Sequence, residues 1–125
     1  MAAVTTLTKT AADNRSFQGA GVLGVVDTYA ATMIPAIKPD QKEQFICVDA
    51  TGNSTINAAT VLTNLRQWDH VYFLITGNGG ARTITWGTGF LVTAATLVSG
   101  SGKDLVAHFI YDGANLKEVS RAILL

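Results

Sequence analysis

The sequence is poor in charge. Only 14% of its 125 residues are Asp, Glu, Lys or Arg, and nine basic residues balance nine acidic ones; a typical soluble domain has about 25% charged residues. Because Lys and Arg are scattered singly, the chain lacks the basic patch of a nucleic-acid-binding protein, and we expect no nucleic-acid partner. So few charges protect a surface poorly from self-association, so we expect part of it to be covered by copies of this chain or by another protein.

Cysteine and long hydrophobic runs are also scarce. The one cysteine, Cys47, lies in the apolar run Phe45–Val48, where a small buried side chain is expected rather than a catalytic thiol. No apolar run approaches the roughly 20 residues of a membrane helix, and Met1–Thr10 has no continuous apolar segment typical of a signal peptide. We therefore expect synthesis in the cytoplasm and no membrane partner.

Strand-forming residues dominate what is present. Runs of Val, Ile, Thr, Phe, Tyr and Trp are bounded by Gly, Asn, Asp and Ser, which is typical of strands and their turns. The predicted strands are Phe45–Ala50, Ser54–Asn57, His70–Thr76, Arg82–Trp86, Phe90–Ala94, Leu105–Tyr111 and a last strand ending near Arg121. The pattern predicts an all-β fold, a single antiparallel β-sandwich of the jelly-roll type over residues 28–125.

The N-terminal part differs in composition from the rest. Met1–Asp27 consists largely of Ala, Thr, Gly, Ser and Val, which cannot form a core of their own. We expect residues 1–27 to be an extended arm that is disordered or becomes ordered only against a partner, with Val22–Val26 as a short strand or anchor. Thr28–Lys38 contains Pro35, which favours an edge strand or an extended crossing segment.

Two local patterns concern the connections. Thr51-Gly52-Asn53 returns as Thr76-Gly77-Asn78, and each copy is followed by a Thr-Ile pair, which suggests one hairpin used twice. Apolar residues in Ala58–Gln67 have helix-like spacing, so one helical turn or a loop is expected there.

Few residues suggest catalysis. His70 and His108 are the only histidines, and neither has a nearby carboxylate or cysteine at metal-ligand spacing. Gly100–Lys103 resembles a phosphate loop, but Leu97 stands where that motif needs glycine and Asp104 where it needs a hydroxyl. We expect no enzyme, no cofactor and no metal site; a histidine paired with a carboxylate in a cleft would revive an enzymatic hypothesis.

Two kinds of binding surface remain open. His70–Ile75 is apolar on both faces, so its outer face is expected against a neighbouring subunit if it is not covered within the chain. Alternatively, an aromatic platform could stack on sugar rings. Its candidates are Tyr72, Trp86, Phe90 and Tyr111.

The order of these motifs resembles a domain of tailed-bacteriophage structural proteins, found in head-decoration, head-fibre and tail-fibre or tail-tip proteins. The matching pieces are Phe45, Thr51–Ile56, His70–Ile75, Arg82–Gly87, Phe109–Gly113 and Ser120–Arg121. The resemblance implies an all-β sandwich that commonly forms trimers and is not catalytic. Asp112-Gly113 would then form a tight turn, Trp86 and Phe109 would fill a core or an interface, and Gly87 and Gly89 would allow a bend.

The resemblance implies a virion structural protein exposed on the particle surface. We expect a capsid decoration or head-fibre protein that forms a homotrimer and binds the major capsid protein. The alternative is a tail-fibre or tail-tip module that binds a host surface glycan, although Leu116 replaces the aromatic residue that often follows the Asp-Gly turn. Expected capsid-docking residues are Val22, Leu23, Val25 and Val26, and expected subunit contacts are Tyr72, Leu74, Trp86 and His108.

Overall fold

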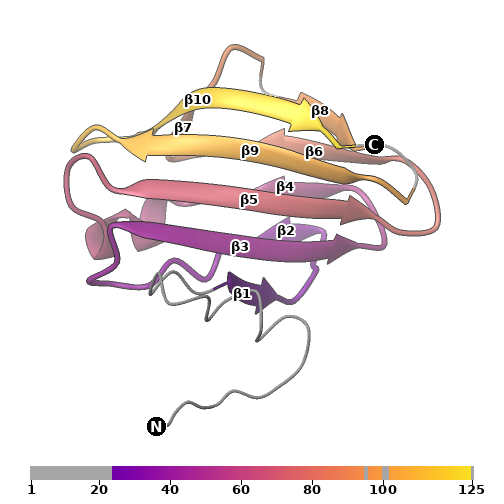
Figure 1. Ribbon diagram of the computed structural model, residues 1–125, viewed down its shortest axis with the longest axis horizontal. Coiled ribbons are helices and arrows are strands. Elements are labelled where there is room, and N and C mark those ends of the chain that lie inside the picture. Colours follow the sequence, from indigo (N-terminus) through magenta and orange to yellow (C-terminus); the bar gives the residue numbers. More distant parts are fainter. Residues whose placement is uncertain (1–23, 95, 100–101, 125) are drawn as a thin grey trace, which may run out of the picture.

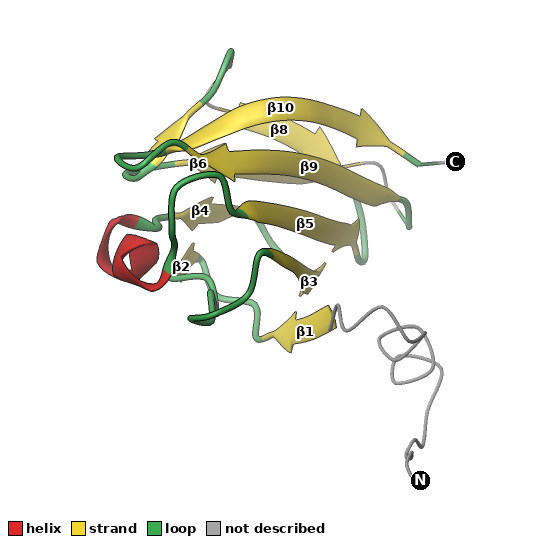
Figure 2. Cartoon of the chain, turned by 60° about the vertical axis from the view of Figure 1, so that its left-hand side comes forward, coloured by secondary structure: helices red, strands yellow, loops and turns green. Residues whose placement is uncertain are grey.

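The computed structural model describes residues 24–94, 96–99 and 102–124, and at 96–99 it describes the backbone alone. Its strands are β1 Gly24–Asp27, β2 Thr32–Met33, β3 Glu43–Ala50, β4 Ser54–Ile56, β5 His70–Gly77, β6 Arg82–Trp86, β7 Phe90–Leu91, β8 Thr96–Ser99, β9 Asp104–Tyr111 and β10 Leu116–Ile123. A short 3₁₀ helix, η2, spans Ala59–Asn64 and lies at one end of the strands (Figure 2). The expected all-β class is confirmed.

The strands form two sheets, one in front of the other in Figure 1. The larger has six strands in the order β1-β3-β5-β9-β10-β7, and the smaller has four in the order β2-β4-β6-β8. From β1 to β6 the chain crosses to the other sheet after every strand. Strands consecutive in sequence therefore lie in different layers. The chain from β1 to β6 winds as a coil in which each turn adds one strand to each sheet, and each strand pairs with a strand from the next or the previous turn of this coil.

The expectation of purely antiparallel sheets is wrong, because this coil makes its lateral neighbours parallel. β1/β3 and β3/β5 are parallel in the large sheet, as are β2/β4 and β4/β6 in the small one. The antiparallel pairs are β5/β9, β9/β10 and β6/β8. The jelly-roll topology is not confirmed, since a jelly roll is built of antiparallel strands.

The repeated Thr-Gly-Asn segments mark successive crossings between the sheets rather than two copies of a hairpin. The first connects β3 to β4 and the second leads from β5 to β6. Asparagine side chains tie these crossings together: Asn53 accepts a hydrogen bond from the Thr83 backbone N–H at 3.0 Å, and Asn78 donates to Asp49 at 3.0 Å. These bonds satisfy turn groups and fix the spacing of the coil.

Several predicted elements are confirmed with changed limits. The expected helical turn is the 3₁₀ helix η2, while the strand expected at Phe90–Ala94 is only β7, Phe90–Leu91. β8, Thr96–Ser99, was not predicted. Gly24–Asp27, expected at the end of the arm, form β1 and pair with β3; residues 1–23 of the expected arm lie outside the described residues.

The core lies between the two sheets. β5 and β9 contribute alternate side chains with no exposed surface, and β6 contributes Ile84 and Trp86 from the opposite layer. Phe73, Trp86, Phe90 and Phe109 form an aromatic cluster with ring centroids 4.9–6.0 Å apart, most of them edge to face. This cluster joins strands that are distant in sequence and anchors the layers to each other.

The bend between β6 and β7 depends on glycine, as expected. Gly89 has φ +93°, and a Cβ there would lie 2.9 Å from the backbone nitrogen of Ala59. The Ala58 backbone N–H donates to the Thr88 carbonyl at 2.8 Å, which ties the bend to the chain before η2. A side chain at position 89 would therefore meet backbone that cannot move independently.

We predict that Gly89→Ala lowers the free energy of unfolding by about 2 kcal/mol or more, because positive φ and the backbone clash add. Gly113→Ala is the matched control: it has φ +101°, but the nearest atom to an added Cβ is 3.9 Å away, on Gln67. It should lose only about 1 kcal/mol, from the left-handed conformation alone. Urea unfolding measures both, and equal losses would show that the close approach at Gly89 is unimportant.

A largely covered carboxylate, that of Glu118, fastens the segment after β7 to β10. The Glu118 side chain is 7% exposed and accepts hydrogen bonds from the Thr93 backbone N–H at 3.0 Å and hydroxyl at 2.9 Å. Arg121 donates to the other carboxylate oxygen and to the Ala94 carbonyl at 2.9 Å. The Arg121 hydrogen bond, followed by those from Thr93, lowers the pKa of Glu118 to about 2 against the opposing effect of burial.

We predict a loss of stability in acid from this group. Its folded pKa of about 2 lies below the ordinary 4.5, so the stabilisation is complete above the ordinary value and disappears as the pH falls through about 2. The loss should be on the order of 2–3 kcal/mol. Glu118→Gln should be less stable at neutral pH and less sensitive to acid, as measured by urea unfolding across this range; an unchanged acid sensitivity would contradict the assignment.

Candidate functional site: an open sheet face

The outer face of the six-stranded sheet is the most distinctive surface of the described chain. The inward side chains of β3, β5 and β9 are buried, whereas their outward side chains are partly exposed, and no labelled helix or strand lies in front of them in Figure 1. We call this surface the open face. Its apolar and aromatic members are Val26, Phe45, Cys47, Tyr72, Leu74, Val106, His108 and Ile110.

The strand register arranges the open face in rows. Phe45, Tyr72 and His108 form one row, and Val26, Cys47, Leu74 and Val106 form the next. Polar side chains occupy the two ends: Glu43 and His70 lie beyond the first row, and Asp49, Thr76 and Asp104 lie beyond the second. The face is thus an apolar band with polar ends, which is the usual distribution of a protein interface.

The first row is a stack of rings. The Phe45 and Tyr72 centroids are 4.7 Å apart with planes 23° from parallel, and those of Tyr72 and His108 are 4.1 Å apart at 10°. Aromatic cross-strand pairs stabilise a sheet. Because the rings lie face to face, Tyr72 is covered on both of its faces, and the rings direct their edges outward.

The two histidines meet beside this stack. His70 Nδ1 and His108 Nε2 are 2.8 Å apart, so one ring donates a hydrogen bond and the other accepts it. Burial is the main cause that lowers the pKa of His108; the neighbouring His70 charge adds to this effect, and Glu43 opposes it. Burial, with a smaller contribution from Glu43, raises the pKa of Tyr72. The surroundings of the stack therefore favour neutral side chains.

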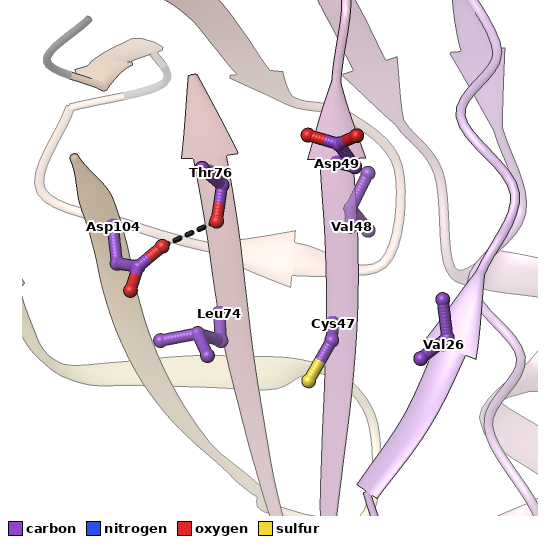
Figure 3. Close-up of a pocket in the computed structure, with 7 residues that line it drawn as sticks. All are labelled: Val26, Cys47, Val48, Asp49, Leu74, Thr76 and Asp104. Atoms are coloured by element: carbon purple, nitrogen blue, oxygen red, sulfur yellow. Dashed lines mark hydrogen bonds between the residues drawn. The ribbon is translucent and has the colours of Figure 1, made fainter. Parts of the chain in front are cut away.

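A shallow depression lies in the second row, at the acidic end of the open face (Figure 3). It encloses about 250 Å³ and is lined by Val26, Cys47, Val48, Asp49, Leu74, Thr76 and Asp104. The Thr76 hydroxyl donates a hydrogen bond to Asp104. The volume falls below the roughly 300–1,000 Å³ of typical small-molecule sites.

The two histidines and the acidic side chains are the candidates for chemistry in the sequence. The side-chain hydrogen bond found for each histidine joins it to the other rather than to a carboxylate. Within the described ranges there is no group of three or more His, Cys, Asp or Glu side chains that could hold a metal ion. Among those same residues, no helix has the length and apolar character needed to cross a membrane.

The expected subunit contacts are only partly brought together. Tyr72, Leu74 and His108 lie side by side on the open face. Trp86 is 4% exposed and belongs to the core between the sheets, so assigning it to subunit contact is wrong: its strand turns it toward Phe73 and Phe109.

The residues expected to dock on the capsid, and the aromatic residues expected to bind sugar, are likewise only partly found on the described surface. Val25 and Val26 lie in β1, with Val26 70% exposed, whereas Val22 and Leu23 lie outside the described residues. Of the four platform candidates only Tyr72 lies in the ring stack; Trp86 and Phe90 are buried, and Tyr111 packs against the core.

Sequence reasoning missed Phe45 as a functional candidate. The alternation in β3 placed it on the same face as Cys47, but only the pairing of β3 with β5 puts it beside Tyr72. Comparison with known proteins adds nothing to this geometry: no family model, no curated protein and no solved structure matches the chain.

We predict that the ring stack contributes measurably to stability. Tyr72→Leu removes both stacking contacts and should lower the free energy of unfolding by about 1–3 kcal/mol. Tyr72→Phe keeps the ring and should stay within about 0.5 kcal/mol of the natural protein. Denaturant unfolding at one fixed protein concentration compares the variants, and equal stability of the two would refute a role for the stack.

Proposed function

We propose that this chain is a non-enzymatic virion structural protein of a tailed bacteriophage, a capsid decoration or head-fibre protein that forms a homotrimer on the capsid. The observation that carries the proposal is the open face, an apolar and aromatic band on the outside of a sheet. The low charge of the sequence supports it, and so does the resemblance of the motifs to phage structural domains.

The open face has the properties of a surface that is covered in use. Val26 and Phe45 are 70% and 37% exposed, and their rows continue across the sheet with Leu74 and Tyr72. A continuous exposed patch of this kind favours association, because burying apolar area is worth about 25 cal/mol per Å². A stable contact requires about 800 Å² per partner, which we propose is supplied by this face.

In the proposed trimer, three two-layered sandwiches turn their open faces toward a common axis. β5 lies in the interior of the six-stranded sheet, so Tyr72 and Leu74 would be nearest the axis and the polar ends of the face would form the rim. The assembly would act mechanically, adding cohesion to a shell of major capsid protein. Val25 and Val26, together with the chain before them, are the proposed capsid-docking segment.

The tail-fibre alternative, binding of a host glycan, has weaker support. Sugar rings bind aromatic side chains through an open ring face, but Tyr72 is covered on one side by Phe45 and on the other by His108. Carbohydrate recognition would therefore use the outer face of Phe45, ring edges or another surface. A glycan array that shows specific binding would favour this alternative over capsid decoration.

The proposal predicts self-association through the open face. The natural protein at micromolar concentration should have the mass of a trimer in analytical ultracentrifugation, and Leu74→Glu, which places a charge in the apolar band, should weaken association at least about tenfold. Ile34→Glu is the matched control, because Ile34 is 58% exposed and lies outside the six-stranded sheet. A monomeric natural protein, or equal effects of the two variants, would overturn the proposal.

A further inference from the structure

The histidine pair places titratable groups inside the surface proposed for self-association. His70 and His108 are the only histidines among the 125 residues, and the register of β5 with β9 brings both to the open face. They contact each other at 2.8 Å, and His108 also stacks on Tyr72. Both histidines of the chain therefore lie next to each other on the open face.

We infer that self-association through the open face is controlled by the protonation of the His70–His108 pair, so that the assembly is stable at neutral pH and dissociates in mild acid. This inference rests on the proposed function and names the regulation of the same surface. Its basis is the direct contact of two imidazoles within an apolar band.

The chemistry of the pair gives the direction. When both rings are neutral, one N–H donates to the lone pair of the other, and the contact carries no charge. One added proton preserves the hydrogen bond but introduces a positive charge, and a second places two N–H groups against each other. In the separated chain water solvates this charge, whereas in the assembly the charge would be buried. Association therefore favours the unprotonated pair, and dissociation is coupled to proton uptake.

The other charged groups around the pair do not reverse this direction. Glu43 on β3 lies in the same end row and favours the protonated form of His108, but burial and His70 have the opposite effect, and burial is the larger cause of the lowered pKa. Lys117 on β10 lies opposite Ile110 and pairs with Asp112 at 3.4 Å. The remaining neighbour on β5, Tyr72, is neutral in this range, since its pKa is raised.

Carboxylates at the far end of the face are separated from the pair by the second row. Asp49 and Asp104 lie beyond Leu74 and Val106 in the register. An unperturbed histidine side chain changes its charge between about pH 5 and about pH 8. A change in assembly between about pH 8 and about pH 5.5 that disappears when both histidines are replaced therefore reports on His70 and His108.

The test measures the association constant of the natural protein by analytical ultracentrifugation at about pH 8 and about pH 5.5, with EDTA present so that no metal bridges the histidines. We expect association at least about tenfold weaker in acid, the effect of one pKa unit. Circular dichroism at both pH values checks that the chain remains folded. The double variant His70→Gln/His108→Phe keeps a ring stacked on Tyr72. Its association constants at the two pH values should agree within about twofold.

The outcomes separate the two proposals. A trimer that is equally stable at both pH values, or a double variant that still dissociates in acid, overturns the pH control and leaves the proposed function standing. A natural protein that is monomeric even at about pH 8 overturns self-association itself, and the control with it. His108→Phe alone provides a second variant: it should reduce the pH dependence, and a dependence equal to that of the natural protein would also overturn the inference.

Discussion

The parallel pairing of β3 with β5 is the interaction on which the other features depend. Eight consecutive residues of β3 lie opposite eight of β5 without a break in register, and β9 then continues the sheet on the other side of β5. Because successive residues of a strand point to opposite faces, this single register decides which side chains enter the core and which remain outside. A shift by one residue would bury Tyr72 and expose Phe73.

The same register produces the unusual outer surface. A sheet with one covered face normally alternates apolar and polar residues. Here the inward positions are apolar, and the outward positions also carry apolar or aromatic side chains, among them Phe45, Tyr72 and Leu74. The rings stack and the histidines meet because the register places these side chains next to each other on adjacent strands. Apolar area of this kind is unfavourable in water, and this cost is the basis of the proposed self-association.

The coil that alternates between the sheets also explains how so small a domain stays ordered. Each crossing is fastened by specific polar groups: asparagine side chains join successive crossings, and the fully buried Gln44 exchanges two hydrogen bonds with the Lys38 backbone, at 2.8 and 3.0 Å. These bonds satisfy backbone groups that would otherwise be buried without partners. The frame that results holds the outward rings of Phe45 and Tyr72 side by side on the open face.

The sequence by itself determined the long strands, their alternation and the local turns, but not β8 or the short length of β7. The Asp112-Gly113 turn and the bend at Gly87–Gly89 follow from the residues at those positions, and the alternation follows from a period of two residues; both are local properties. Only the tertiary structure decided the parallel order, the burial of Trp86 and the contact of His70 with His108. The reason is physical. The alternation of residues predicts the two faces of a strand, but the neighbours of that strand and the face that stays open depend on pairing between segments far apart in the chain.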